Sequence, residues 1–306
     1  EALSRAVLSP ENVEDCNPKL AVRVLSACTN ILVHSRFTQE SGTLSELFET
    51  LGEHLLSTQL SPEDTSSAIL AYARASYTVD LGIFDHLVRL LVANPDVCTN
   101  RQLAQSYWAC GKMTTFETSG DGEPEGLLPS YAESSLSLAL SLAGRSSSLS
   151  RQDVTQGLWA SAQLQIDDDH VVEQLSCRAR MLSPDFSARE IANVLWSLSK
   201  IGSEDFKTIY SLLQRISTDQ SLNFSPQESS SIMYALASMN IRDDVVYRLL
   251  SDSILANMHS ANAQAIANAL WAHQKVYITP PNKLLECWAT SKLGIVPIQP
   301  RVVDWY

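Results

Sequence analysis

The chain has 306 residues, of which 45% are hydrophobic and 18% are charged, a composition that indicates a folded protein large for a single core. Its net charge of -12 argues against bulk, non-specific binding of nucleic acid, although a local basic stripe is compatible with it. No uncharged apolar run approaches the roughly 18 residues that a membrane-spanning helix needs, so we expect no membrane insertion. Six scattered cysteines form no C-x-x-C pair, which favours reduced thiols in a cytosolic or organellar interior.

Residues 1–20 contain Pro10, Pro18 and an acidic cluster, and we expect them to form an N-terminal cap or strap. A sequence repeat follows them. Its clearest copies, Ile191–Ile201 and Ile266–Val276, each contain a tryptophan, which we call the anchor of the repeat. The same pattern places seven anchors along the chain, at Leu32, Leu70, Trp108, Trp159, Trp196, Tyr234 and Trp271.

Successive anchors are 37 or 38 residues apart, except for one spacing of 51. One fixed period with a single interruption is typical of a solenoid, in which each repeat buries its apolar face against its neighbours. The sequence therefore predicts an all-α fold. Its predicted architecture is a right-handed α-solenoid of about seven helix-turn-helix repeats, forming a single domain over residues 21–293.

Each repeat is expected to contain an anchor helix and a partner helix with apolar residues at helical spacing. Nine residues before six of the anchors stands a favourable N-cap residue: Ser61, Thr99, Ser150, Ser187, Ser225 and Asn262. Five of these six are followed, three residues later, by an acidic residue or a glutamine that can complete a capping box. The expected partner helices include Leu47–Leu56, Ile83–Leu91, Val171–Cys177, Phe206–Ile216, Val245–Leu250 and Leu284–Trp288. The residue before each anchor is large and apolar, and five residues after the anchor stand Phe37, Ala75, Met113, Leu164, Ile201, Met239 and Val276. These two columns are predicted to form the core, and the residue directly after the anchor is mostly small.

Two segments interrupt or end the repeats. The long spacing between the third and fourth anchors leaves an insertion of about 13 residues around Thr114–Leu128, by comparison with the usual period. Its glycines, proline and acidic residues, without a basic residue, predict a solvated acidic loop. Residues 294–306 form a C-terminal tail with apolar residues near its end, which we expect to pack on the last repeat or on another chain.

Two columns of the anchor helix are candidates for function. Three residues before the anchor stand seven uncharged hydrogen-bonding residues: Thr29, Ser67, Gln105, Gln156, Asn193, Ser231 and Asn268. Four residues after the anchor stands a mostly basic column: Arg36, Arg74, Lys112, Gln163, Lys200, Ser238 and Lys275. At 100° per residue both columns lie away from the core column, so we expect them to share one exposed face.

A solvated helix side normally collects lysine and glutamate, so a row of amides and hydroxyls favours a binding face. Amides and hydroxyls can pair with the base edges of single-stranded RNA, while neighbouring arginines and lysines meet phosphates. The polar column and the five basic members of the second column are therefore the predicted RNA-binding residues, with one polar residue per base as the simplest interpretation. Two alternatives remain: the polar column faces solvent, or it makes tight hydrogen bonds between repeats. The aromatic anchors either pack between repeats or stack on bases.

The 37-to-38-residue period, the segment Asp185–Glu190 and the run Ile191–Gly202 resemble the octotricopeptide and heptatricopeptide repeat proteins. The resemblance covers roughly residues 20–293 and is strongest from 150 to 277. Those families are α-solenoids that bind organellar RNA in transcript processing, stability and translation, or that serve as subunits of mitochondrial ribosomes. The resemblance therefore implies a mitochondrial protein, or alternatively a plastid one, that binds or stabilises single-stranded or ribosomal RNA beside other protein subunits of a ribonucleoprotein complex.

Two other classes of function are alternatives to RNA binding. A protein-binding scaffold of the armadillo or HEAT type would use the same side of the repeats for an extended peptide. An enzyme is not expected, because the S-x-x-K pattern at Ser197–Lys200 belongs to the basic column of the repeat. Asp167–His170 opens a partner helix, where the helix dipole favours acidic residues. No P-loop, zinc-protease or nucleophile-elbow motif is present, so we expect no cofactor and no metal ion.

Overall fold

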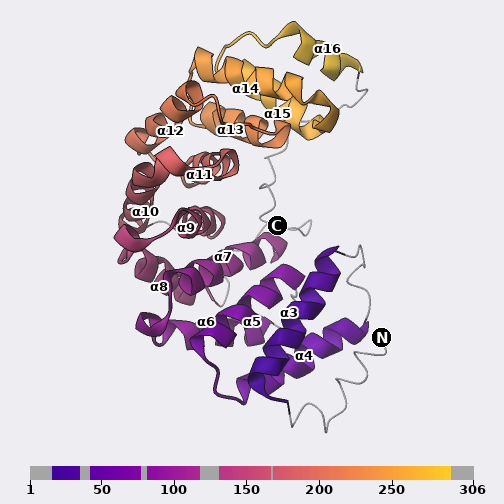
Figure 1. Cartoon of the computed structure of the whole chain (residues 1–306), viewed down its shortest axis with the longest axis vertical. Coiled ribbons are helices and arrows are strands. Elements are labelled where there is room, and N and C mark those ends of the chain that lie inside the picture. The colour runs from indigo at the N-terminus through magenta and orange to yellow at the C-terminus, as the bar shows by residue number, and fades with distance from the viewer. Residues whose placement is uncertain (1–15, 35–41, 77–80, 118–130, 167, 291–306) are drawn as a thin grey trace. The chain divides into compact units, whose positions relative to one another are not determined.

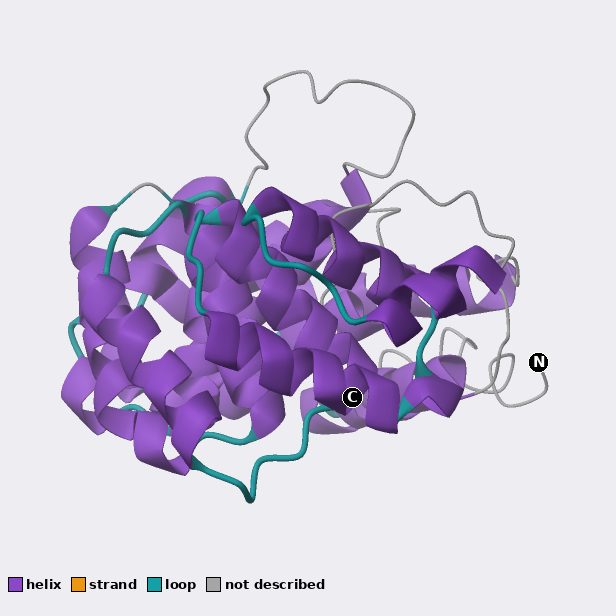
Figure 2. Cartoon of the chain, turned by 90° about the horizontal axis from the view of Figure 1, so that it is seen from above, coloured by secondary structure: helices purple, strands orange, loops and turns teal. Residues whose placement is uncertain are grey.

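The computed structural model describes residues 16–34, 42–76, 81–117, 131–166 and 168–290 (Figure 1). In these residues it contains fourteen α-helices, four short 3-10 helices and no strand (Figure 2). The prediction of an all-helical fold is confirmed. Among the helices that the structure describes, none combines the length and apolarity needed to cross a membrane.

Anchor helices and partner helices alternate along the chain, as the repeat predicts. The anchor helices are α3 (Pro18–His34), α5 (Pro62–Ala75), α7 (Asn100–Glu117), α9 (Arg151–Gln163), α11 (Ala188–Ile201), α13 (Pro226–Ser238) and α15 (Ala263–Lys275). The partner helices are α4 (Gly42–Leu56), α6 (Leu81–Val92), α8 (Ala132–Ala143), α10 (Asp169–Leu182), α12 (Phe206–Thr218), α14 (Asp244–Ala256) and α16 (Asn282–Thr290). Short 3-10 helices precede four of the anchor helices: η1 (Pro95–Val97), η2 (Ser146–Ser148), η3 (Ser183–Asp185) and η4 (Met258–Ser260).

The helices form two compact units, and within each unit every second helix packs together. In the first unit, residues 1–149 and 163–166, α5 contacts both α3 and α7, while α6 contacts both α4 and α8. In the second unit, residues 150–162 and 167–306, α13 contacts α11 and α15, while α12 contacts α10 and α14. Each unit therefore has a layer of anchor helices and a layer of partner helices (Figure 1). This arrangement is compatible with an α-solenoid.

All six predicted N-caps are confirmed. Ser187 Oγ accepts a hydrogen bond from the Glu190 N–H (3.3 Å), and the Glu190 carboxylate accepts one from the Ser187 N–H (2.7 Å). The same reciprocal pairing starts α7, α9 and α13, and Ser61 and Asn262 accept from the N–H three residues later. The first repeat departs from the pattern, because Arg23, the residue nine before its anchor, lies within α3, which begins at Pro18. A cap of this kind stabilises a helix by about 1 kcal/mol.

The predicted core is confirmed for most of the column before the anchor, although Leu270 of the last repeat is half-buried. The residue before the anchor is fully buried in five repeats, at Ile69, Tyr107, Leu158, Leu195 and Met233. Burial of such a side chain contributes about 1.5–3 kcal/mol to folding. Of the column five residues after the anchor, Met113 and Val276 are buried, whereas Ala75, Leu164, Ile201 and Met239 are half-buried. The small residues after the anchor are buried as well, at Ala71, Ala109, Ala160, Ser197, Ala235 and Ala272. Their size lets neighbouring anchor helices approach closely.

The anchor helices end in a backbone geometry that the sequence analysis missed. Six residues after the anchor, φ is positive in five repeats, at Ser76, Gln165, Gly202, Asn240 and Tyr277. Only glycine, and to a lesser degree asparagine, favours this left-handed conformation. Because it recurs with five different residue types, the packing of the repeat imposes it rather than the residue.

The predicted acidic loop over Thr114–Leu128 is wrong at its start, because α7 continues to Glu117. Thr114 stands six residues after its anchor, and a β-branched residue strongly disfavours positive φ. Its hydroxyl instead donates to Cys110 O (3.1 Å), one turn earlier in the continuing helix. Residues 118–128 lie outside the described residues, as do positions 1–15 of the predicted cap and the tail 294–306. The single domain over 21–293 stays a prediction.

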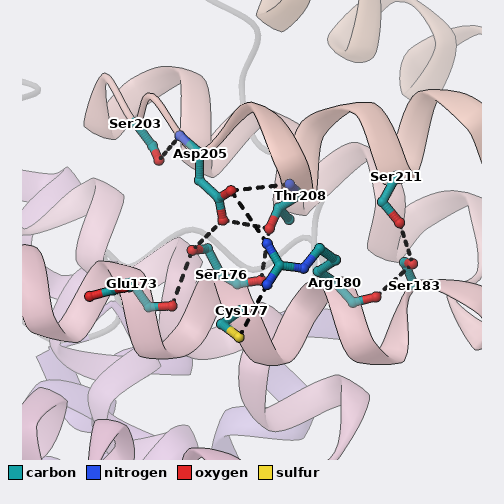
Figure 3. A network of polar contacts seen from close by, with 9 residues as sticks. All are labelled: Glu173, Ser176, Cys177, Arg180, Ser183, Ser203, Asp205, Thr208 and Ser211. Carbon is teal, nitrogen blue, oxygen red and sulfur yellow. Dashed lines mark hydrogen bonds and ion pairs between the residues drawn. The ribbon is translucent and has the colours of Figure 1, made fainter.

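A polar network joins the partner helices α10 and α12 (Figure 3). Asp205, the N-cap of α12, accepts hydrogen bonds from the Thr208 N–H (3.2 Å) and from Ser176 Oγ of α10 (2.9 Å). Arg180 of α10 lies 3.7 Å from the same carboxylate. Burial raises the pKa of Asp205, but the hydrogen bonds and the Arg180 charge outweigh burial and hold the pKa below its ordinary value. The network therefore ties the start of one partner helix to the middle of the preceding one.

Candidate functional site

The polar column is mostly buried, so the prediction that it lies on an exposed face is wrong. Thr29, Gln156, Asn193, Ser231 and Asn268 are each no more than 6% exposed, and Ser67 and Gln105 are half-buried. The prediction from the helical wheel took account of a single helix and not of the helices beside it. In the structure α13 has an anchor helix on each side, and in α11 every residue from 191 to 198 is buried. Neighbouring anchor helices thus cover positions that face away from the core column.

Thr29 shows what a buried residue of this column can do. Its Oγ1 lies 2.8 Å from Leu25 O in its own helix and 3.2 Å from Ala71 O in α5. The hydroxyl therefore links two neighbouring anchor helices. This geometry supports the alternative of hydrogen bonding between repeats at this position.

Three amides of the column retain a polar atom that is buried and has no hydrogen-bond partner among the described residues. These atoms are Gln156 Oε1, Asn193 Nδ2 and Asn268 Nδ2. A buried polar group left unpaired costs about 1–3 kcal/mol. The same repeat position carries this cost in α9, α11 and α15, so the column has hydrogen-bonding capacity that the described fold leaves unused.

The basic column is exposed in the second unit. Lys200 of α11 and Lys275 of α15 are exposed, on the two anchor helices that contact α13. Arg74 and Lys112 are half-buried, and Lys112 Nζ lies 5.5 Å from the centroid of the Trp108 ring, a cation–π distance. Arg36 lies outside the described residues.

The aromatic anchors fall into two groups. Trp108, Trp159 and Trp196 are between 3% and 8% exposed, which supports the alternative that these anchors pack between repeats. Tyr234 and Trp271 are half-exposed, and their rings stack with centroids 4.7 Å apart and planes inclined by 27°. The stacked pair bridges α13 and α15. Because both rings reach solvent, they can offer an aromatic surface to a planar ligand.

The accessible residues around this pair form what we call the aromatic strip. It comprises the half-exposed or exposed residues seven before, at, and four after the anchor in α11, α13 and α15: Arg189, Lys200, Gln227, Tyr234, Ser238, Gln264, Trp271 and Lys275. The strip holds three cations and no carboxylate, in a chain whose net charge is -12. Arg189 Nε lies 3.8 Å from Glu228, which offsets part of its charge.

The sequence analysis missed the strip residues Arg189, Gln227 and Gln264. A signal for them was present, because positions seven before, three before, at and four after the anchor follow one side of a helix. The predicted ligand contacts covered the positions three before and four after the anchor, with the aromatic anchor between them, and left out the position seven before it.

A serine and a histidine meet between α14 and α15, at a distance that would suit a catalytic pair. Ser251 Oγ lies 2.9 Å from His273 Nε2, and the rings of Tyr247 and His273 form a T-shaped pair with centroids 5.5 Å apart. Burial lowers the pKa of His273. Ser251 is fully buried and His273 is 2% exposed, so a substrate cannot reach either side chain. We interpret the cluster as packing between the two helices.

Other residues considered for chemistry have structural roles. Asp168 caps α10 by accepting from the Val171 N–H (3.0 Å), as expected for acidic residues at a helix start. Ser197 of the S-x-x-K pattern is fully buried and donates to Asn193 O (2.8 Å). In the part of the chain that the structure describes, no three His, Cys, Asp or Glu side chains gather as metal ligands would.

Fold and site together define an all-helical protein with layered helices and an aromatic, basic strip on the anchor-helix layer of its second unit. No protein-family model matches the chain, and a comparison with curated proteins found no match. The chemistry of the strip is therefore the basis for a functional proposal.

Proposed function

We propose that this protein binds single-stranded RNA along the aromatic strip. The observation that carries the proposal is the half-exposed stack of Tyr234 and Trp271. Two exposed lysines accompany it, Lys200 of α11 and Lys275 of α15, each four residues after the anchor of its helix. A base that stacks on an aromatic side chain gains about 1–3 kcal/mol, and nearby lysines and arginines meet the phosphates. The net charge of -12 repels RNA elsewhere on the molecule, so binding would depend on this local arrangement.

Under this proposal the predicted RNA-binding residues differ in importance. Lys200 and Lys275 are exposed and act as phosphate contacts. Arg74 and Lys112 are half-buried and contribute less, while Thr29 uses its hydroxyl within the protein. The buried amides meet RNA only after the side chains that cover them have moved.

We infer further that the helices form a right-handed α-solenoid of about seven repeats over residues 21–293. The support is that capping boxes, positive φ after the anchor and contacts between every second helix recur in both units. A solenoid presents its repeats as an extended surface, which suits a linear ligand.

The resemblance to octotricopeptide and heptatricopeptide repeats extends the proposal to an organelle. We place the protein in the mitochondrion, with the plastid as the alternative, as a ribosome-associated subunit that holds a single-stranded segment of ribosomal RNA. It acts there without catalysing a reaction. Fractionation of mitochondria tests the location: sedimentation with ribosomal particles supports it, and recovery outside the organelle contradicts it.

Binding of a fluorescent single-stranded RNA, measured by anisotropy, tests the proposed interface. Trp271→Ala should weaken binding about tenfold, the effect expected from loss of one stacking interaction. Tyr210→Ala is the matched control, because Tyr210 is an exposed aromatic residue on partner helix α12. Equal affinities for wild type and Trp271→Ala, or crosslinks confined to the partner helices, would contradict the proposal.

One observation favours a second candidate, a protein-binding scaffold. Large apolar side chains are exposed along three successive partner helices: Phe206, Tyr210, Val245, Leu249 and Leu285. Exposed apolar groups of this kind mark surfaces that bind other proteins. A peptide crosslinked to these partner helices, with no RNA crosslinked to the strip, would establish the scaffold in place of RNA binding.

A further inference from the structure

The hydrogen bond between Gln264 and Asn268 uses the side-chain carbonyl of Asn268 and leaves its side-chain N–H groups unused. Gln264 Nε2 donates to Asn268 Oδ1 (2.7 Å), which fixes the orientation of the Asn268 amide. The remaining polar atom, Asn268 Nδ2, has no hydrogen-bond partner among the described residues, and Asn268 is fully buried. What this position can offer a ligand is therefore an N–H donor and not a carbonyl acceptor.

Asn268 lies one helical turn before Trp271 on the same side of α15. Gln264, Asn268, Trp271 and Lys275 follow one another along the same side of α15 at helical spacing. Asn268 is buried, whereas Gln264 and Trp271 are half-exposed and Lys275 is exposed. Trp271 stacks on Tyr234 of α13, so the ring pair and the unused donor belong to one region of the α13–α15 contact.

We propose that the Tyr234–Trp271 pair opens to admit one planar base, and that Asn268 Nδ2 then donates to an acceptor on the edge of that base. Gln264 is a positioning residue, because it holds the amide with its N–H group directed to the ligand. The inference rests on the proposed function and adds a specificity to it. The bound base would carry a carbonyl oxygen where a discriminated base carries an amino group.

Two energetic terms favour insertion of a base between the two rings. The inserted base replaces one ring–ring stack with two, so the stacking energy that opening the pair costs is recovered. The unpaired N–H gains its missing partner, which removes an unfavourable contribution of the free protein. An amino group at the same place would instead set donor against donor. Lys275, one turn beyond Trp271, lies where the backbone phosphate of the inserted nucleotide can reach it.

Two pairs of bases isolate the proposed contact. Uracil carries a carbonyl group where cytosine carries an amino group, and its adjacent ring nitrogen bears a hydrogen where that of cytosine has a lone pair; hypoxanthine and adenine differ in the same way. Equal-length oligonucleotides of each base are titrated against the full chain. Wild type should bind oligouridine about tenfold more tightly than oligocytidine, and oligoinosine more tightly than oligoadenosine, as expected for one matched against one mismatched hydrogen bond.

The variant Gln264→Glu tests the direction of the proposed hydrogen bond most directly. A carboxylate at position 264 accepts from Asn268 Nδ2, which turns the amide and directs Oδ1 to the ligand. The preference should then reverse toward cytosine and adenine, while the added negative charge weakens all RNAs alike. Gln227→Glu is the matched control, because it adds the same charge at the same repeat position of α13, where Ser231 replaces the amide. Its affinities should fall without a change in their ratio.

The outcomes separate this inference from the proposed function. If oligonucleotides bind and Trp271→Ala weakens them, but uracil and cytosine bind equally, RNA binding stands and base recognition by Asn268 is refuted. The same refutation follows if Gln264→Glu and Gln227→Glu change the ratio equally. If no oligonucleotide binds, both proposals fail. Circular dichroism of each variant confirms that its helices are intact before affinities are compared.

Discussion

Gly52 lies where helix α4 meets Tyr72 of α5 and Ile83 of α6. A Cβ atom at this position would be 2.3 Å from Tyr72 Oη and 2.7 Å from Ile83 Cδ1, closer than real contacts allow. Tyr72 is fully buried and its Oη donates to Phe48 O (2.6 Å), so it has little room to move. The residue type is therefore set by a contact between helices and not by backbone conformation.

Gly52→Ala should lower the free energy of unfolding by about 1–3 kcal/mol, the usual cost of overpacking a core. Denaturant unfolding measures the change. Gly144→Ala serves as the control, since the added Cβ there would meet only ordinary contacts at 3.5 Å or more. Equal midpoints for the two variants would show that Tyr72 relaxes without cost.

The left-handed position after the anchor gives a second prediction for single residues. Tyr277 occupies it with φ 58° and is 88% exposed, whereas Gly202 occupies it with φ 75° and open space around it. Left-handed geometry costs an L-residue about 1–2 kcal/mol. Tyr277→Gly should therefore stabilise the protein by about 0.5–1 kcal/mol, and Gly202→Ala should destabilise it by about 1 kcal/mol. Thermal unfolding of both variants checks the opposite signs, and shifts of the same sign would contradict the explanation.

Among the elements, the junction of α10 and α12 depends on the charge of Asp205. Its folded-state pKa is lowered, so its stabilising effect is present above the unfolded pKa, about 3.9 for aspartate, and is lost as pH falls through the folded value. Asparagine also caps helices well, so Asp205→Asn removes mainly the charge.

Asp205→Asn should be less stable than wild type at neutral pH by up to about 1 kcal/mol, since the ion pair that it removes is partly exposed. The difference should shrink from about pH 4 downward as the wild-type carboxyl takes up a proton. Urea unfolding across this range measures it. Asp243→Asn, at the N-cap of α14, is the control, because among the described residues its carboxylate accepts only from its own helix. A difference between Asp205→Asn and wild type that does not vary with pH would contradict the role of the network.

At the scale of the whole molecule, charge decides how RNA binding responds to salt. The five basic residues predicted from the sequence would neutralise at most five phosphates, for a log–log salt slope of about -3.5 with single strands. The half-buried Arg74 and Lys112 favour a smaller slope.

Lys200→Ala should weaken binding of all RNAs alike and flatten the slope by about 0.7, the contribution of one phosphate contact. Affinities at several salt concentrations give the slope. Lys207→Ala changes the same charge at an exposed site of partner helix α12 and should leave the slope almost unchanged. Identical slopes for both variants would place the RNA away from the anchor helices.

Features that depend on residues close together in the chain were predictable from the sequence. The period of the anchors predicted the alternation of helices, and the N-caps were predictable because Ser187 and Glu190 interact across three residues of one helix. The core column followed from its uniform apolar character, as at Leu195. These interactions require no knowledge of the neighbouring repeat.

The candidate site depended on tertiary structure. Asn193 and Asn268 have the polarity of surface residues, yet both are buried because anchor helices flank them, and a wheel of one helix contains no such neighbour. Trp196, Tyr234 and Trp271 share one repeat position, yet only the last two are half-exposed and form the accessible stack. The periodicity of a repeat assigns a direction to each side chain, but the packing of adjacent helices decides whether that direction leads to solvent.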